Sequence, residues 1–432
     1  MKTYRNIKEI GASRPAAGKF IGAILIVALM MGLAGTADAT GLANARATAM
    51  GGAYTSLAKG SDGTYFNPAN LGFSALQQNG VQIVGVGVAI SNNSFSLDDY
   101  NSYTGATLSQ SDKDELLGKI PTEGLKVRAD AEASVFGVSM ANFAVSISAI
   151  AATEINLGRA PLELLLNGNT LADTIDLNGM YGEGYGLGAV NFSYGQRIYK
   201  NVDRQLSIGG TFKYLKGFGY EEVTEMNGEA VTLATGFEGA GSLVSRTATG
   251  GAGYALDLGA SLQISRNYTV GVSLFNFLSS IKWDKDTEEH RFQFNFDTLT
   301  VVNMGDDDLI TSSDTTVEIG SFNSSLPSTI KVGLAKTNGK LLWAVDWEQG
   351  FRTAPGSSTT PRISSGAEYR LLSFLPLRAG FALGGKPGTT FSGGMGFDLS
   401  LFYLDFAVAS MNAISGASGK GLNFAVNTGL RF

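Results

Sequence analysis

The sequence predicts an all-β fold, a 14-stranded antiparallel transmembrane β-barrel with an N-terminal plug (hatch) in its lumen. Three observations lead to this prediction. Apolar and polar residues alternate strictly up to the last residue, and the composition is rich in glycine and poor in charge. In addition, an even number of candidate strands is joined by short connectors at one end and mostly long ones at the other.

The last segment of the chain carries the clearest of these signals. In Gly421–Phe432 (GLNFAVNTGLRF) every second residue from the end is compatible with lipid, and the residues between them suit water. A hydrophobic edge strand invites aggregation, whereas the closing strand of a barrel pairs with the first strand and leaves no edge. We therefore predict that the lipid-facing side of this segment is the membrane-insertion signal. Its residues are Phe424, Val426, Leu430 and Phe432.

The composition narrows the class of protein. Charged residues make up 16% of the chain, well below the roughly 25% of a typical soluble domain. The absence of cysteine excludes a lipoprotein anchor, disulfides and thiolate metal sites. Beyond the N-terminal segment the chain has no run of 18 apolar residues, which argues against membrane-spanning helices. A net charge of −6 argues against nucleic-acid binding.

Residues 1–39 have the three parts of a secretory signal peptide. Basic residues precede the apolar run Phe20–Ala34, and Ala37-Asp38-Ala39 supplies a cleavage site. The alternative, an N-terminal membrane anchor, needs an apolar run of about 20 residues. We therefore expect a bacterial outer-membrane protein, exported through a cleaved signal peptide. Residues 40–79 would form the plug, and residues 80–432 the barrel with its long extracellular loops.

Alternating segments bounded by turn signals give fourteen candidate strands. They are residues 80–91, 126–139, 142–155, 182–198, 204–220, 251–264, 268–284, 326–336, 340–350, 360–370, 375–384, 389–398, 401–411 and 421–432. Short turns at one rim and long loops at the other are typical of outer-membrane barrels, and the even count brings both chain ends to one rim. A β-sandwich would show similar alternation, but its apolar faces would pack inward on each other.

The segment before the first strand, Thr40–Gln78, does not have a strand pattern. It is rich in small residues and contains the turn dipeptides Asp62-Gly63 and Asn67-Pro68. The lumen of a fourteen-stranded barrel is wide enough to need a filling or to form a pore. We therefore expect this segment to be a plug inside the barrel, with a cap below the barrel as the alternative.

Two short motifs in this segment resemble the hatch of the FadL-type long-chain fatty-acid transporter superfamily. One lies within Asn44–Ala53 and the other within Tyr65–Leu71. The plug motif comprises Gly51, Gly52, Asn67, Pro68 and Ala69. Gly253–Gly259 and Ser273–Trp283 are similar to relatives such as the type IX secretion barrel PorV and the TraF-like barrels, and Phe95–Met140 resembles superfamily members of unknown function. The resemblance implies a hatch and fourteen strands, but a fold does not fix a function.

Residue types needed for catalysis are scarce. The single histidine, His290, lies in the charged run Asp284–Arg291, which we expect to be a loop. Hydrolases need such a base beside a nucleophile, so we expect no enzyme activity and no cofactor. The acidic residues of this run could bind Ca²⁺ or Mg²⁺. The other interpretation is a solvated loop or a site bridged by lipopolysaccharide.

Two of the long loops contain predicted helices. Ser111–Asp114 has the pattern of a capping box that opens a helix over Asp112–Ile120. Pro161–Asn167 has proline in its first turn. The second helix would expose Leu162, Leu164, Leu165 and Leu166. An apolar helix on the outer face predicts a capture groove for a hydrophobic ligand, as in the FadL type. A lid packed on the barrel mouth, or an anchor at the lipid headgroups, is the alternative.

Charged residues of both signs fall on the lumen-facing side of the predicted strands. They are Arg128, Asp130, Glu132, Lys213, Asp257, Asp346, Glu348, Arg362, Glu368, Arg370 and Arg378. We expect them to form a solvated or salt-bridged wall that holds the plug. Arg128, Lys213 and Arg378 are also the candidates for binding a carboxylate ligand.

These features together predict a passive uptake channel for hydrophobic, fatty-acid-like small molecules. The alternative is a barrel of the PorV type that docks secretion or surface-assembly partners without transport. The expected partners are outer-membrane lipid and the barrel-assembly machinery, together with a hydrophobic small molecule or a secreted protein.

Overall fold

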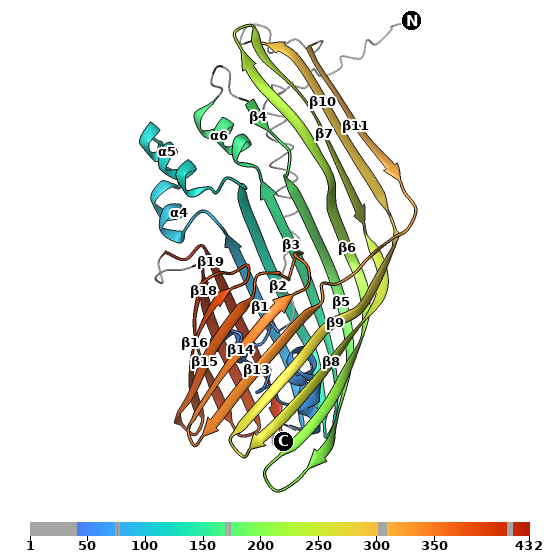
Figure 1. Ribbon diagram of the computed structural model, residues 1–432, viewed down its shortest axis with the longest axis vertical. Helices are drawn as coiled ribbons and strands as arrows, with labels where there is room; N and C mark the ends of the chain where they lie inside the picture. Colours follow the sequence, from blue (N-terminus) through green and yellow to red (C-terminus); the bar gives the residue numbers. More distant parts are fainter. Residues whose placement is uncertain are drawn as a thin grey trace, which may run out of the picture.

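The computed structural model describes residues 41–73, 76, 78–168, 171, 174–300, 309–412 and 418–432. The predicted signal peptide lies outside the described residues. Fourteen strands form a closed antiparallel barrel, which confirms the predicted fold (Figure 1). They are β1 (Gly80–Asn92), β2 (Leu125–Met140), β3 (Phe143–Leu157), β5 (Tyr181–Lys200), β6 (Gln205–Leu233), β8 (Gly250–Ser265), β9 (Tyr268–Lys285), β13 (Thr329–Asn338), β14 (Leu341–Gly350), β15 (Arg362–Leu372), β16 (Leu375–Gly384), β17 (Thr390–Leu399), β18 (Phe402–Met411) and β19 (Gly421–Arg431).

Each barrel strand pairs with the next one in this order. The last strand, β19, pairs with β1 from Gly80↔Arg431 to Ser91↔Gly421 and so closes the wall. Tight turns join the strands at one end, which we call the short-turn rim, and both ends of the barrel chain lie there. The opposite end is the long-loop rim.

The wall presents apolar side chains outward. In β19, Leu422 and Phe424 are exposed, whereas Ala425 and Asn427 are buried in the lumen. The same outward exposure recurs on strands around the ring. It includes Val88, Tyr214, Ile363, Leu383 and Val408. A soluble surface rarely carries so extensive an apolar belt, so the belt is the lipid-facing surface of the barrel. Among the described residues no helix is both long and apolar enough to span a membrane.

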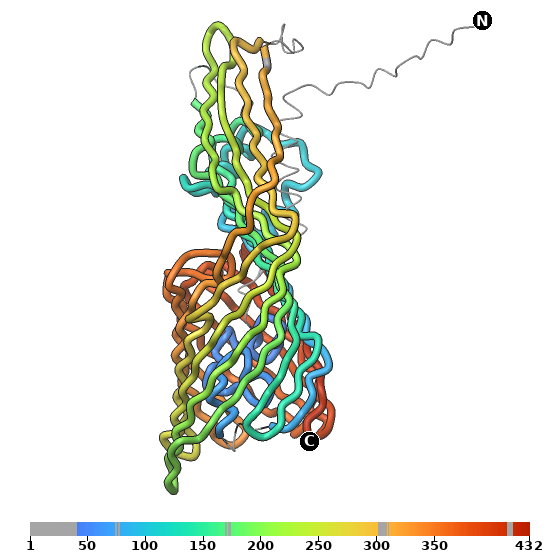
Figure 2. Tube along the Cα trace, turned by 90° about the vertical axis from the view of Figure 1, so that its right-hand side faces the viewer, coloured from blue at the N-terminus to red at the C-terminus, as the bar shows by residue number. Residues whose placement is uncertain are grey.

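The plug fills the lumen near the short-turn rim (Figures 1 and 2). It contains α2 (Ala45–Ala49), η1 (Gly60–Asp62), α3 (Gly63–Phe66) and η2 (Pro68–Gly72). The side chain of Asn44 caps α2, and that of Asn67 caps η2 with proline directly after it. Wall glycines let η2 approach closely, because a Cβ on Gly209 would lie 2.5 Å from the Pro68 carbonyl carbon.

A four-stranded sheet rises beyond the long-loop rim (Figure 1). It consists of the far half of β6 with β7 (Gly236–Ala248), β10 (Glu288–Leu299) and β11 (Ile310–Glu318). Two short strands, β4 (Thr174–Asp176) and β12 (Phe322–Ser324), pair with β6 and β9. Residues 221–250 and 285–325, which lie between the predicted strands and were expected to be long loops, therefore contain strands, and that expectation is wrong. His290 also lies in β10 rather than in a loop, with its ring beside the hydroxyl groups of Thr316 and Thr247.

Three helices also lie beyond the long-loop rim (Figure 1). The first, α4 (Leu97–Tyr103), was not predicted. The second, α5 (Gln110–Lys119), starts two residues earlier than expected, because Ser109 rather than Ser111 forms the capping box with Asp112. Both serines are followed three residues later by an aspartate, so the pattern alone did not distinguish them. The third, α6 (Arg159–Asn167), extends the predicted helix by two residues at its start.

Candidate functional site: the lumen and its two barriers

Two wall carboxylates hold the plug by its backbone. Glu132 of β2 accepts the backbone N–H groups of Gly41 and Ala43, at 2.9 and 3.1 Å. Asp346 of β14 accepts those of Tyr54 and Thr55, at 3.0 and 2.8 Å. Both carboxylates are almost completely buried. Each one satisfies two N–H groups of irregular backbone that would otherwise be buried without partners.

A chain of ion pairs ties the plug to the wall. Arg46 of α2 donates to both oxygens of Glu368 on β15, at 2.7 and 3.2 Å. Glu368 also accepts from Arg378 on β16, at 2.8 Å, and Arg378 reaches Asp405 on β18 at 2.6 Å. The guanidinium of the predicted ligand-binding residue Arg378 therefore pairs with two wall carboxylates.

The residues of the plug motif lie at two places where the plug contacts the wall. Gly51 and Gly52 both have positive φ angles, +69° and +97°, and a Cβ on Gly51 would lie 3.0 Å from the backbone nitrogen of Phe381. Asn67 donates to the carbonyl of Ala260 and to the hydroxyl of Ser261 on β8, while its own oxygen accepts from Ala69. The motif residues thus serve close contact between plug and wall.

Above the plug the lumen changes from polar to apolar. On β5 the inward residues at plug level include Ser193, which donates to Thr64 of the plug. Further along the same strand, the inward residues are Ala189, Leu187 and Tyr185. They belong to a buried cluster of inward side chains from the surrounding strands. It contains Ala152, Tyr185, Leu187, Ala189, Leu215, Tyr220, Ala248, Ala255, Ile281 and Trp283. The upper lumen is therefore more apolar than the expected charged wall.

The wall is interrupted beside this cluster. The ladder between β9 and β13 stops at Phe275↔Thr329, and β9 next pairs with β12, at Ile281↔Ser324. On the other side of β9, the ladder with β8 shifts between Leu256 and Leu258. Asn276 lies in this bulge with a φ of +50°.

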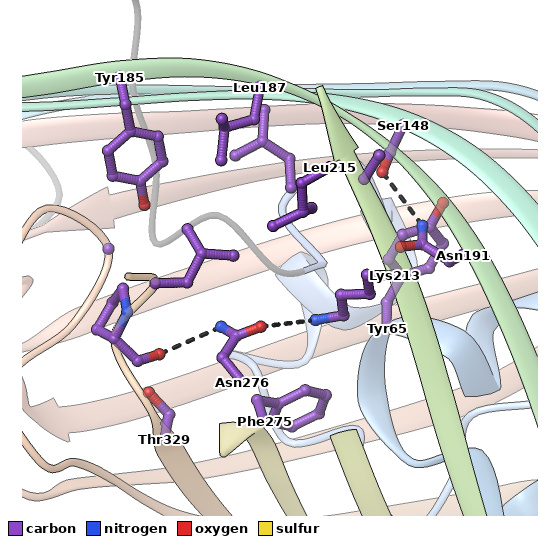
Figure 3. A pocket seen from close by; sticks show the side chains of 15 residues that line it. Tyr65, Ser148, Tyr185, Leu187, Asn191, Lys213, Leu215, Phe275, Asn276 and Thr329 are labelled. Carbon is purple, nitrogen blue, oxygen red and sulfur yellow. Dashed lines mark hydrogen bonds between the residues drawn. The ribbon is translucent and has the colours of Figure 1, made fainter. Parts of the chain in front are cut away.

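Side chains bridge the interruption in place of a backbone ladder. The amide of Asn276 donates to the carbonyl of Pro327 at 3.2 Å, and Ser279 donates to that of Leu326 at 3.2 Å. Lys213 donates to Asn276 at 3.0 Å (Figure 3). Lys213 also pairs with Asp257 at 2.8 Å, and together these contacts hold the bulge from within. Pro327 has no N–H to offer a ladder. At this place side-chain hydrogen bonds replace the backbone ladder of the wall.

A cavity of about 40 Å³ lies between the plug, the apolar cluster and the interruption. Tyr65 of the plug lies at one end of it, Leu187 and Leu215 line one side, and Phe275 and Asn276 line the opposite side (Figure 3). This volume is enough for a water molecule or two, but not for an organic ligand. A ligand could therefore occupy this cavity only if side chains moved.

The loop between β14 and β15 folds inward and covers the cavity. We call Phe351–Pro361 the lid. Its turn at Ala354–Ser357 is held by reciprocal backbone hydrogen bonds, and Ala354 and Ser357 are buried although they lie in a loop at the rim. Gly356 of this turn lines the cavity.

One lysine holds the lid across the barrel mouth. Lys386, in the turn between β16 and β17, donates to the Ala354 carbonyl and pairs with Glu154 of β3. Glu154 also faces Arg128 at 3.5 Å, and Arg128 donates to the Lys386 carbonyl at 3.1 Å. We call Arg128, Glu154 and Lys386 the latch. Strands β17, β18, β19 and β1 lie between the turn that carries Lys386 and Arg128 on β2, so the latch spans part of the mouth.

The leucines of α6 have two different environments. Leu164 packs against an apolar cluster on the outer sheet, which contains Ile175, Leu177, Ala230 and Phe294. Leu165 is 54% exposed, while Leu162 and Leu166 are half-buried. Of the four leucines predicted to be exposed together, one is therefore clearly exposed. A capture groove formed by all four is not observed.

The structure places the other predicted site residues as follows. Arg128, Lys213 and Arg378 all face the lumen, but each forms an ion pair, and they lie in three separate clusters. Phe424, Val426 and Leu430 alternate with the buried residues of β19, as an insertion signal requires, and Phe432 ends the chain at the short-turn rim. Sequence reasoning missed the lid, Lys386 and the interruption at Asn276. Pro327 was the one local signal, because proline is rare within a paired strand.

Comparison with known proteins gives a family and a fold. The sequence matches the model of a family of unknown function, DUF5723, over residues 68–240 and 232–406. No curated protein matches it significantly. The structure is similar to the toluene transporter TbuX of Ralstonia pickettii, with 15% identity and a TM-score of 0.52 over 90% of this chain and 98% of that one. It is also similar to the toluene transporter TodX of P. putida, with 11% identity and a TM-score of 0.52 over 90% and 98%. A Pseudomonas aeruginosa FadL homologue gives 12% identity and a TM-score of 0.52 over 92% and 100%. The likeness at these identities is one of fold, and it agrees with the resemblance in the hatch motif.

Proposed function

The chain belongs to the DUF5723 family, whose description names no activity, and we propose that it is an outer-membrane channel for passive passage of an uncharged hydrophobic molecule. The observation that carries the proposal is the apolar upper lumen that ends at the interruption between β9 and β13. A hydrophobic molecule in such a lumen could leave sideways into the membrane without crossing the tightly bound plug.

The entry side of this route is the lid. When the latch releases Ala354, the turn Ala354–Ser357 can leave the lumen and expose the apolar cluster beneath it. Leu165 of α6, which lies beyond the same long-loop rim as the lid, offers an exposed apolar contact for capture. Long loops lie on the outer side of outer-membrane barrels, so entry would be from outside the cell.

The exit side is the bulge at Asn276. Because side-chain hydrogen bonds rather than a ladder bridge Ser325–Ser328 to β9, opening this part of the wall breaks fewer backbone bonds than opening it elsewhere. The cavity of about 40 Å³ beside it would then be the closed form of the passage.

The state of the lumen cations favours an uncharged ligand over a fatty acid. Arg128, Lys213 and Arg378 are each paired with a wall carboxylate, so a ligand carboxylate would have to displace one. Breaking a buried pair leaves an uncompensated charge, which costs roughly 3–5 kcal/mol. Two of the similar structures are toluene transporters, which fits the same choice of a neutral aromatic or aliphatic hydrocarbon.

The test is uptake into liposomes with a wall that can be locked. The chain has no cysteine, so a single engineered pair can be cross-linked without side reactions. In Ser279→Cys/Leu326→Cys, a short bifunctional thiol reagent would join the two sides of the interruption. We expect labelled toluene to enter proteoliposomes faster than empty liposomes, and the cross-link to abolish most of this difference.

The matched control is Ile363→Cys/Leu383→Cys, which joins two exposed residues opposite each other in the intact ladder of β15 and β16. Cross-linking this pair should leave uptake unchanged. Equal rates in proteoliposomes and empty liposomes would refute the channel. A channel whose rate is insensitive to both cross-links would refute the sideways exit.

A further inference from the structure

Two cavities at the short-turn rim lie outside the route described above. One, of about 280 Å³, lies between the plug and the turns that follow β8 and β13. The other, of about 430 Å³, lies between the plug and the end of β19. Both are lined by Arg46, Lys59 and Arg370, so they meet at these three side chains. We call the two cavities together the vestibule. Unlike the cavity above the plug, it has room for a ligand.

The vestibule has a strong excess of positive charge. Six cationic side chains line it, against two side-chain carboxylates, Glu368 and Asp398. The cations are Arg46, Lys59, Arg266, Lys340, Arg370 and Arg431. Both carboxylates are already in use, because Glu368 pairs with Arg46 and Arg378, and Asp398 pairs with Arg370 and Arg431. The chain as a whole is acidic, with a net charge of −6, so this concentration of cations is not a general property of its surface.

Lys59 lies where the two cavities meet, and its charge is poorly stabilised by its surroundings. It comes from the plug, outside the membrane-spanning strands, and is half-buried. Its ammonium makes no hydrogen bond or ion pair within the described part of the chain. Burial, together with the nearby Arg46 and Arg431, lowers the pKa of Lys59 from 10.5 to about 8. The attraction of Glu368 does not offset these effects, so an added anion would stabilise the charged form of this lysine.

We propose that the vestibule binds a phosphate group, held between Lys59 of the plug and Arg370, Arg431 and Lys340 of the wall. Several cations around one cavity suit an anion with more than one charge and several acceptor oxygens better than a single carboxylate. The phosphate could be free or belong to the headgroup of a phospholipid at this rim. In both cases it would connect the plug to three wall segments and stabilise the plug in the lumen.

The first test measures the reactivity of Lys59 in the intact purified protein. Near pH 8 an unoccupied Lys59 is partly deprotonated and should react with an amine reagent much faster than Lys113 of α5, as quantified by mass spectrometry. Inorganic phosphate should slow the modification of Lys59 by about tenfold at saturation and leave Lys113 unaffected. Chloride at matched ionic strength should not protect Lys59.

A lipid arm distinguishes the two sources. Protein in nanodiscs with phosphatidylglycerol and no free phosphate should show the same protection if a headgroup enters the vestibule, and none if only free phosphate does.

Calorimetry with inorganic phosphate should show one saturable site that Lys59→Gln weakens by about tenfold and Lys113→Gln leaves unchanged. Lys59→Gln should fold normally, since its ammonium has no partner to lose. Protection by neither phosphate nor lipid, or equal protection by chloride, would overturn the proposal. Neither outcome affects the proposed passage above the plug.

Discussion

The plug and the lid close the same lumen with different kinds of contact. The plug is bound all around: Glu132, Asp346, Glu368 and Asn427 reach it from four parts of the wall, and wall glycines pack directly on its backbone. The lid is hydrogen-bonded at its base to Ser325, Ser328 and Gly385, but its turn is held across the mouth by Lys386 and, more weakly, by a 3.5 Å hydrogen bond from Tyr185 to Pro355.

This difference indicates which barrier moves. Displacing the plug would leave several buried carboxylates and backbone N–H groups without partners at once, and each such group is costly. Displacing the lid breaks the contacts of one loop, while Lys386 and Arg128 can keep their ion pairs with Glu154, so no buried charge loses its partner. We therefore expect the lid to open first and the plug to stay in place, and the predictions below test this ordering.

The largest effect should come from removing the two carboxylates that hold the plug backbone. In Glu132→Ala/Asp346→Ala, four N–H groups lose their acceptor, at a cost of about 1–3 kcal/mol for each unsatisfied group that water does not reach. The plug should loosen, so that trypsin cuts after Arg46 and Lys59 in the folded barrel, and planar bilayers should show larger single-channel currents.

Glu348→Ala is the matched control for this variant. Glu348 lies on β14 with Asp346 and pairs with Lys331 of the wall at 2.9 Å. Its removal should leave the plug resistant to trypsin. If the double variant keeps the plug as resistant as the wild-type protein, the carboxylates do not anchor it and the comparison fails on this side.

A smaller effect is expected at the lid. Lys386→Met removes the donor to Ala354 and the partner of Glu154, and should shift the lid toward an open state without moving the plug. With Ser357→Cys as a reporter, labelling by a water-soluble maleimide should accelerate about tenfold, equivalent to about 1.4 kcal/mol. Trypsin resistance of the plug should not change.

The control for the lid is Lys113→Met in α5, which contributes nothing to the latch. It should leave the labelling of Ser357→Cys at the original rate. Equal labelling in all three backgrounds would mean that the latch does not hold the lid.

The barrel could be predicted from the sequence because each of its strands shows an alternation of apolar and polar residues over consecutive positions. In β19 the alternation of Leu422, Asn423 and Phe424 is visible in consecutive residues, and the lipid outside enforces it. The same reasoning missed β7, β10 and β11, since beyond the rim water covers one face and polar residues such as Glu289 and Gln293 occur inside strands. Phe292 and Phe294 of β10 do alternate with polar residues. The neighbouring strand β7, however, contains glycines, which have no side chain and so give no alternation of apolar and polar residues.

The site depended on contacts that no local pattern records. That Arg128, Lys213 and Arg378 face the lumen followed from strand alternation. That each of them is paired with a carboxylate could not be predicted. Arg128, for example, faces Glu154 of β3, which also pairs with Lys386, 232 residues away in the sequence. The interruption at Asn276 is likewise a property of two segments, one of which carries Pro327.

The smallest effect concerns the helices outside both barriers. Burial acts to raise the pKa of Asp99 in α4, but hydrogen bonds from Lys119 and Ser96 outweigh it, so this pKa lies below its ordinary value of 3.8. A carboxylate with a lowered pKa contributes stability that is present at neutral pH and is lost as the pH falls through that value. Below pH 3.8 the contact between α4 and α5 should therefore weaken.

Hydrogen-exchange protection of α4 amides should fall a few-fold between pH 6 and pH 3 in the wild-type protein. The control variant Asp98→Asn should behave in the same way, because Asp98 lies outside the capping box and the Lys119 pair. Asp99→Asn should show little pH dependence and unchanged toluene uptake, since neither the latch nor the plug involves this helix. A large change of uptake in Asp99→Asn would show that α4 and α5 belong to the moving barrier, and the lid alone would no longer explain entry.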